Sequence, residues 1–227
     1  MSIIISRDDF KVIHNPSKNQ YIFKILFNIY SEDLVKSITK SKIILGATTT
    51  EKYDTLVLNA TSVKSFADFH KDQTITNGTR RLPIPIISKI LYDLSNQLKY
   101  LISYKNKTFI GYNTENIVVI DNNKFVYLSN EYLKDIDTNE ETIMISSPFT
   151  SKEYFLSPEL LEVKVIPSYI NYKTSYFSLG QLIVNLFSED ENENEILENI
   201  HIKNTKLYFS LERMLEKDPT NRSIIFI

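Results

Sequence analysis

The hydrophobic pattern of the chain changes near residue 60, and this change limits the folds that are open to it. Short runs before that point are rich in β-branched and aromatic residues, which predicts strands at 10–13, 21–27, 42–45 and 53–58. A helix is expected from Ser31 to about Lys40, because Ser31 can cap its first turn and two acidic residues follow. Farther along, apolar residues at spacings of three and four predict one long helix: Ile87, Leu91, Leu94, Leu98 and Leu101.

The rest of the chain is mostly helical in character and contains one hairpin. A short helix is expected at 64–70, followed by a polar loop at 71–81. Two apolar runs at 117–120 and 124–128 flank Asp121-Asn122-Asn123, which predicts a β-hairpin. The remaining segments are a polar loop at 134–150, a buried helix at 176–187, an acidic stretch at 188–199 and an amphipathic helix at 207–215.

Composition argues against several functional classes. The 227 residues are 42% hydrophobic and 24% charged, which is typical of one globular domain with a core. A net charge of −2 argues against a general nucleic-acid binder. The absence of Cys removes thiolate metal sites and cysteine nucleophiles, and three separated His residues do not suggest a metal site. No apolar run reaches the roughly 18 residues of a membrane span, and the N-terminus does not resemble a signal peptide.

Glycine is rare, with four in the whole chain, and none precedes Gly46. The first fifth of the sequence therefore contains no glycine-rich loop that could cradle phosphates.

Four short motifs follow one another in the second half of the chain. They are Gly111-Tyr112-Asn113-Thr114-Glu115-Asn116, Ser157-Pro158-Glu159, Phe177-Ser178-Leu179-Gly180 and Asp218-Pro219-Thr220-Asn221-Arg222. In this order they resemble the catalytic loop H-R-D-x-x-x-x-N, the A-P-E motif, the start of the buried central helix and the late D-P-x-x-R stretch of the protein kinase family.

The resemblance covers nearly the whole chain and implies a two-lobed, kinase-like α+β fold. Residues 1–60 would form a reduced, β-rich N-lobe that is short by a strand, and residues 61–227 a mostly helical C-lobe. Together they would make one kinase-like domain.

The family's catalytic positions can be carried over residue by residue. Asn116 takes the place of the loop asparagine that binds magnesium, but Gly111 stands where the catalytic aspartate should be and offers no proton acceptor. Phe109 and Ile110 replace the His and Arg of the motif, and Ser129 replaces the metal-binding aspartate of D-F-G. The resemblance therefore implies no catalytic residue and no metal site.

A nucleotide site, if one survives, would use four residues. Lys24 resembles the V-A-I-K lysine that pairs with phosphates, and the alternative is a lysine that faces solvent. Asn59 and Ala60 lie in the connector that binds adenine in the family, and the alternative is a plain link between lobes. Asn116 completes the set.

Two further features concern structure. The resemblance implies an ion pair between Glu159 and Arg222, and loss of one partner of a buried pair costs about 3–5 kcal/mol. Ser175 replaces an aspartate at the start of the central helix and is expected to act as its N-cap.

The missing groups imply a pseudokinase, a kinase-like domain without phosphotransfer that acts as a protein-binding or regulatory module. Its partner would be a protein, either a kinase or a kinase substrate, and neither nucleic acid nor a membrane. No cofactor is expected, and ATP and magnesium would enter only if nucleotide binding survives. Two alternatives stay open: a divergent active Ser/Thr kinase that uses Glu115 or Glu131 as its base, and a structural or virion protein that has inherited the fold.

Lys far outnumbers Arg, and Ile and Asn are abundant, which suggests an A/T-rich coding genome. A large DNA virus would fit this bias. The expected location is the cytoplasm, which for a viral protein means the host cytoplasm or the virion.

Overall fold

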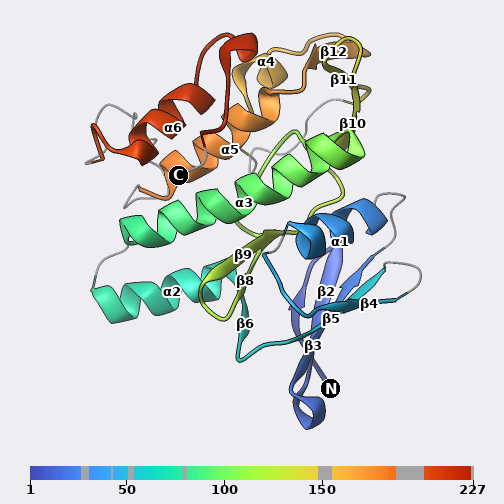
Figure 1. Cartoon of the computed structure of the whole chain (residues 1–227), viewed down its shortest axis with the longest axis vertical. Helices are drawn as coiled ribbons and strands as arrows, with labels where there is room; N and C mark the ends of the chain where they lie inside the picture. Colours follow the sequence, from blue (N-terminus) through green and yellow to red (C-terminus); the bar gives the residue numbers. More distant parts are fainter. Residues whose placement is uncertain are drawn as a thin grey trace.

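The structure is a computed structural model that describes residues 1–26, 31–41, 43–50, 54–78, 81–147, 155–187 and 202–225. Within these ranges, helices and antiparallel strands combine in an α+β fold with three sheets. Figure 1 shows the N-terminal sheet at the lower end of the view and the longer helices above it.

The N-terminal sheet has five antiparallel strands in the order β1-β2-β3-β5-β4. Their bounds are β1 (Ser2–Ser6), β2 (Phe10–Asn15), β3 (Gln20–Ile25), β4 (Thr48–Thr49) and β5 (Thr55–Asn59). Helix α1 (Ser31–Lys40) lies between β3 and β4 in the chain. Alternate strand residues such as Phe23 share one buried core with Leu34 of α1, so the opposite face of the sheet is turned toward solvent.

The second sheet joins β6 (Val63–Ser65) to the hairpin of β8 (Ile117–Ile120) and β9 (Lys124–Tyr127). Asp121 and Asn122 form the hairpin turn with φ of 52° and 57°, a conformation that Asp and Asn tolerate better than most residues. Helix α2 (Phe66–Asn77) follows β6, and the longest helix, α3 (Ile84–Lys105), packs against β9 and α1.

The third sheet has the order β12-β11-β10-β7. It is formed by β7 (Lys107–Phe109), β10 (Leu133–Asp137), β11 (Thr142–Ile145) and β12 (Ser168–Asn171). The remaining helices are α4 (Pro158–Leu161), α5 (Thr174–Asn185) and α6 (Lys206–Met214). Short 3-10 turns occupy Pro16–Lys18 and Pro219–Asn221.

One apolar core runs through most of the molecule. It includes Phe23 of the N-terminal sheet, Leu94 of α3, Val126 of the hairpin and Leu182 of α5. A smaller core lies beneath the third sheet, where Ile110 packs with residues such as Ile143 and Leu160. The chain at Gly111 runs between these two cores, because Ile110 belongs to the smaller core and Tyr112 to the larger one.

Several predicted elements are present with small shifts of their ends. The helices predicted at 31–40, 176–187 and 207–215 are α1, α5 and α6, and the predicted hairpin is formed by β8 and β9. The strands predicted at 21–27 and 53–58 are β3 and β5, although residues 27 and 53 lie outside the described ranges. The acidic stretch at 188–199 also lies outside them.

The N-terminal sheet contains two strands that the sequence analysis missed, β1 and the two-residue β4. Its residues Ile3 and Ile4 are 59% and 39% exposed, so the strand is apolar without alternating burial. The strand predicted at 42–45 is wrong: Ile43 and Ile44 are buried but form bends before Gly46, whose φ is +73°. The N-terminal sheet therefore has five strands in the order β1-β2-β3-β5-β4.

Two segments expected to be loops have regular structure. Residues 71–77 continue α2, which is capped by Ser65 and ends at Gly78, where φ is +69°. This part of the helix is polar because it is largely exposed, so it carries no periodic apolar signal. Residues within 134–147 form the hairpin of β10 and β11. Ile143 and Ile145 are buried on one face of β11, and Met144 between them is exposed on the other face.

Candidate functional site

The position of the expected catalytic aspartate is closely packed. Gly111 follows β7, and a Cβ atom added there would lie 2.7 Å from Leu156 Cδ2 and 3.3 Å from Tyr132 Cδ1. Carbon atoms in contact prefer separations of about 3.5–4.0 Å, so even a methyl group requires Leu156 to move. Position 111 therefore offers no proton acceptor, and a side chain placed there would have to displace the end of Leu156.

Three aromatic rings fill the region beside Gly111. Phe109, Tyr112 and Tyr127 are at most 1% exposed, and their ring centroids are 4.8–5.7 Å apart. The Tyr127 hydroxyl donates a hydrogen bond to the Gly111 carbonyl oxygen at 3.3 Å. The main chain of Tyr127 is in turn fixed by the buried side chain of Gln97, which donates to its carbonyl at 2.8 Å and accepts from its amide at 2.9 Å. Side chains therefore occupy the space beside the catalytic-loop segment.

Tyr112 has an unusual environment within this cluster. Its hydroxyl is buried and has no hydrogen-bond partner among the described residues. Burial raises the pKa of Tyr112 well above its ordinary value, because the ionised phenolate would lose its hydration. The phenol is therefore neutral at physiological pH and is a poor candidate for a base.

The loop between β1 and β2 is hydrogen-bonded to two segments that the resemblance aligns with the metal-binding segments of a kinase, one at Glu115 and one at Ser129. Asp9 Oδ2 accepts hydrogen bonds from the Ser129 hydroxyl and from the Asn130 amide, each at 3.0 Å. Arg7 Nε donates to the Glu115 carbonyl oxygen at 3.3 Å. Ser129, which the resemblance aligns with the D-F-G aspartate, is thus hydrogen-bonded to a carboxylate from the loop between β1 and β2.

Asn116 is 7% exposed and its backbone is fully used. Its amide donates to Asn113 Oδ1 at 3.0 Å, and its carbonyl accepts from the Leu128 amide at 2.9 Å. The two carboxylates considered as alternative bases, Glu115 and Glu131, have exposed side chains. Neither occupies the packed position at Gly111.

The connector residues Asn59 and Ala60 end β5, with Asn59 exposed and Ala60 7% exposed. The next two amides are taken by the hairpin turn: Asp121 Oδ1 accepts from the Thr61 amide at 2.7 Å and from the Ser62 amide at 3.3 Å. Partial burial opposes ionisation of Asp121, but these hydrogen bonds outweigh it and hold its pKa below the ordinary value. The amides of Thr61 and Ser62, directly after Ala60, are therefore bound within the protein.

Lys24 lies on the solvent side of the N-terminal sheet. Its neighbours Phe23 and Ile25 are buried in the core that includes α1, and strand geometry turns Lys24 to the other face, where its side chain is exposed. Ile117, directly after Asn116, is packed inside that core. Lys24 and Asn116 were expected to share a nucleotide site, but the Lys24 side chain is exposed and Asn116 is buried.

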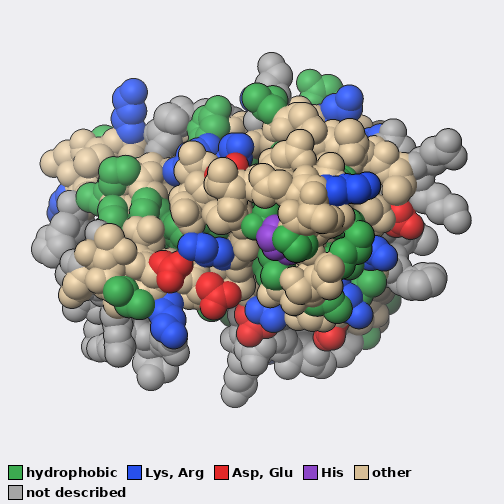
Figure 2. Space-filling model, turned by 90° about the horizontal axis from the view of Figure 1, so that it is seen from below, with side chains coloured by type: hydrophobic (Ala, Val, Ile, Leu, Met, Phe, Trp, Pro, Cys, Tyr) green, Lys and Arg blue, Asp and Glu red, His purple; other side chains and the backbone are tan. Residues whose placement is uncertain are grey.

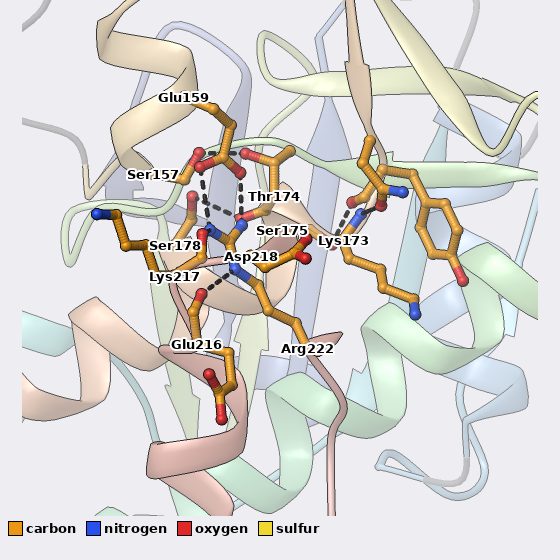
Figure 3. Close-up of polar contacts among 12 residues, drawn as sticks. Ser157, Glu159, Lys173, Thr174, Ser175, Ser178, Glu216, Lys217, Asp218 and Arg222 are labelled. Atoms are coloured by element: carbon orange, nitrogen blue, oxygen red, sulfur yellow. Dashed lines mark hydrogen bonds and ion pairs between the residues drawn. The ribbon is translucent and has the colours of Figure 1, made fainter. Parts of the chain in front are cut away.

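Glu159 and Arg222 are brought together in a bidentate ion pair (Figure 3). The two oxygens of Glu159 accept from Arg222 Nη1 at 2.5 Å and Nη2 at 3.0 Å, and the Arg222 side chain is fully buried. Arg222 also donates to the Glu216 carbonyl at 2.7 Å and lies 4.9 Å from the Phe177 ring. The pair thus joins α4 to the segment after α6.

The pair shifts the titration of Glu159. Partial burial opposes its ionisation, but the hydrogen bonds and charge of Arg222 outweigh burial, so the pKa of Glu159 lies below its ordinary value. The carboxylate remains ionised at physiological pH.

The sequence missed the side chain that holds the catalytic-loop segment. Ser178 of α5 is buried, and its hydroxyl donates to the Ile110 carbonyl at 2.9 Å. Ser175, expected to be the N-cap of this helix, instead lies in its first turn and donates to the Tyr172 carbonyl at 3.0 Å, while the N-cap position belongs to Lys173. A neutral serine one helical turn later therefore contacts the loop.

These contacts test whether a nucleotide with magnesium fits the expected residues. Magnesium prefers anionic oxygen ligands in octahedral geometry, and the two positions that should supply carboxylates hold Gly111 and Ser129. The described part of the chain contains no cluster of three or more His, Cys, Asp or Glu side chains placed to hold a metal ion. The residues present do not fit the family's nucleotide–magnesium complex.

A cavity of about 420 Å³ lies elsewhere, between the segment after α1, helix α3 and the turn of the β8–β9 hairpin. Its lining includes Lys89 and Tyr92 of α3 and Lys124 of the hairpin. None of the residues expected to bind nucleotide lines it.

The surface is mixed in charge. Figure 2 shows basic and acidic side chains interspersed with hydrophobic ones on the face seen from below. No helix within the described ranges is both long and apolar enough to cross a membrane.

Comparison with known proteins gives no assignment. No protein-family model matches the sequence, and none of the curated proteins matches it at a significant level.

Proposed function

We propose that this chain is a kinase-like domain without phosphotransfer activity, which acts as a protein-binding or regulatory module. The order of elements supports a two-lobed kinase-like arrangement of residues 1–60 and 61–227. Five strands with α1 between β3 and β4 precede a connector, the long helix α3, the β8–β9 hairpin and the buried helix α5 (Figure 1).

The packing at Gly111 carries the proposal. General-base catalysis contributes about 10²–10⁴ in rate. Gly111 supplies no base, and a side chain at this position would have to displace Leu156, because its Cβ would lie 2.7 Å from Leu156 Cδ2. Phosphoryl transfer also depends on metal ions that neutralise phosphate charge, and Ser129 is hydrogen-bonded to Asp9 where the metal carboxylate would stand. Both losses act on the same reaction, so their effects compound.

A row of apolar side chains supports a role in protein binding. Ile3, Ile13, Ile22 and Val57 are cross-strand neighbours on the solvent side of the N-terminal sheet. Lys24 extends from the same face, two residues beyond Ile22 on β3. An apolar row beside a lysine favours a partner with an acidic rim, which is the kind of protein partner, a kinase or a kinase substrate, that we propose.

The first experiment measures phosphotransfer. Purified protein incubated with radiolabelled ATP and magnesium is expected to label neither itself nor a generic substrate, and its melting temperature should not rise when ATP and magnesium are added. Labelling that disappears in Glu115→Gln or Glu131→Gln would support the divergent active kinase instead. Both side chains are exposed, so these variants should fold.

The second experiment tests the binding surface. Candidate kinases and substrates are titrated against wild-type protein and the variant Ile22→Asp. Loss of binding by Ile22→Asp, with binding retained by Lys18→Glu at the 3-10 turn, supports the proposed surface. Equal binding by all three proteins contradicts it.

A further inference from the structure

The cavity beside α3 has the features of a ligand site that the proposed function does not use. Its volume of about 420 Å³ falls within the range of about 300–1,000 Å³ typical of small-molecule pockets. Four α3 residues line one side of it at helical spacing: Lys89, Tyr92, Asp93 and Asn96. The other sides come from Ser41, Ile43 and Leu45 after α1, and from Asn123 and Lys124 of the hairpin.

Among the described residues of the lining, Lys89 and Lys124 are cations and Asp93 is an anion. Asp93 is only 1% exposed, and both its oxygens are used: Oδ1 accepts from Lys89 Nζ at 2.6 Å and Oδ2 from the Phe125 amide at 3.0 Å. The acid is therefore part of the cavity wall and not available to a ligand.

The two lysines keep donors for an incoming anion. Their side chains are 41% and 34% exposed, and an ammonium group has three N–H donors. Lys89 uses one of them on Asp93, and Lys124 Nζ lies 3.7 Å from Asp121 Oδ2. The side chains of Asn96 and Asn123 add neutral amide groups to the same lining.

Apolar groups complete the lining. Leu45 is 79% exposed and Tyr92 44% exposed, which are high values for residues of this size, while Ile43 is buried. Lys89 Nζ lies 5.2 Å from the centroid of the Tyr92 ring, so the charge and the aromatic surface are adjacent. A ligand with an apolar body and one charged end would match both parts.

We propose that this cavity binds a small organic anion, with its carboxylate or phosphate between Lys89 and Lys124 and its apolar body against Tyr92 and Leu45. Ammonium and amide groups bind carboxylate and phosphate alike, so the shared chemistry is a compact anionic group on a hydrophobic body. This inference does not depend on the absence of phosphotransfer, because no residue of the two regions is shared.

The test is a titration followed by two-dimensional NMR of the ¹⁵N-labelled full chain. The probes are phenyl phosphate, benzoate, inorganic phosphate and phenol. Phenyl phosphate or benzoate should shift the signals of Asn96, Asn123 and Lys124, more strongly than phenol or inorganic phosphate at equal concentration. A response to benzoate alone indicates a carboxylate ligand, and a response to phenyl phosphate alone indicates a phosphate ligand.

The variant Lys124→Gln removes one cation from the lining. Lys89→Gln is not used, because it would also leave the buried Asp93 without its ion-pair partner. Loss of a partly exposed ion pair is expected to weaken binding by about fivefold. The control Lys18→Gln removes an exposed lysine at the far 3-10 turn and should bind as wild type does. Phenol binding as tightly as the anions, unchanged affinity in Lys124→Gln, or shifts outside the cavity would each overturn the proposal.

Discussion

Replacing Gly111 tests whether packing, and not only the lack of a carboxylate, closes the catalytic position. The added Cβ of Gly111→Ala would lie 2.7 Å from Leu156 Cδ2 and 3.3 Å from Tyr132 Cδ1. Overpacking a core by one methyl group typically costs about 1–3 kcal/mol. Gly111→Asp also buries a charge without a partner and should cost about 3–5 kcal/mol, which is a large part of the roughly 5–15 kcal/mol that stabilises a domain.

The free energy of unfolding is measured by urea denaturation with linear extrapolation. Gly111→Ala is also made in the variant Leu156→Ala, to separate its contact with Leu156 from other effects. Leu156→Ala alone should cost about 2–5 kcal/mol, but it removes the Cδ2 atom that the new methyl group would contact. In that background, Gly111→Ala should be nearly neutral, which gives a coupling of about 1–3 kcal/mol in the double-mutant cycle.

A Gly111→Ala variant as stable as wild type would refute the reasoning, as would a coupling near zero with Leu156→Ala. Phosphotransfer by Gly111→Asp would also contradict it, because that result requires Leu156 to move aside for an aspartate.

Three further predictions concern single side chains, each checked by urea denaturation unless stated. Glu159→Gln should lose about 3 kcal/mol near neutral pH, because it leaves the buried Arg222 unpaired. The pKa of Glu159 in the folded protein lies below 4.5, so the ionised carboxylate stabilises the fold above that pH, and this stabilisation is lost as pH falls through the folded-state pKa. The difference in free energy of unfolding between wild type and Glu159→Gln should therefore shrink in acid, and a difference that does not change with pH contradicts this. Asp9→Ala should cost about 1–3 kcal/mol and speed hydrogen exchange of the Asn130 amide, whereas unchanged exchange would mean that the loop is held otherwise. Tyr112→Phe should be neutral or stabilising by about 1 kcal/mol, because it removes a buried hydroxyl without a partner, and a clear loss of stability would reveal one.

Local signals were strong enough to predict the regular helices and the central hairpin. The residues of α3 that carry the periodic pattern, such as Leu94 and Leu98, are buried, and the Asp121-Asn122 turn has the positive φ that such residues favour. The pairing of Glu159 with Arg222 needed a resemblance, because the two lie 63 residues apart in sequence.

The errors arose where burial is one-sided or absent. Strand β1 and the hairpin of β10 and β11 each expose part of their apolar residues, such as Ile3 and Met144, so no clean alternation marks them. The exposed end of α2 gives no periodic signal, although Ser65 and Gly78 mark its ends.

The sequence could predict which side chains the candidate site lacks, but not which residues pack around it. The sequence shows that Gly111 has no side chain, yet only the fold places Leu156 against it. Likewise, Asp9 lies 120 residues from Ser129, and no local pattern could indicate that they share a hydrogen bond. The direction of Lys24 depends on which face of β3 meets α1, and this is decided by tertiary packing.

The N-terminal sheet shares its core with the rest of the described chain, and polar contacts add to this packing. Asp121 joins the hairpin to the Thr61 amide, and Asp9 joins the β1–β2 loop to Ser129. A rotation of this sheet relative to α3 would have to break such contacts, and each costs free energy to lose. A partner that recognises the arrangement seen here would therefore not have to pay the entropy of ordering it.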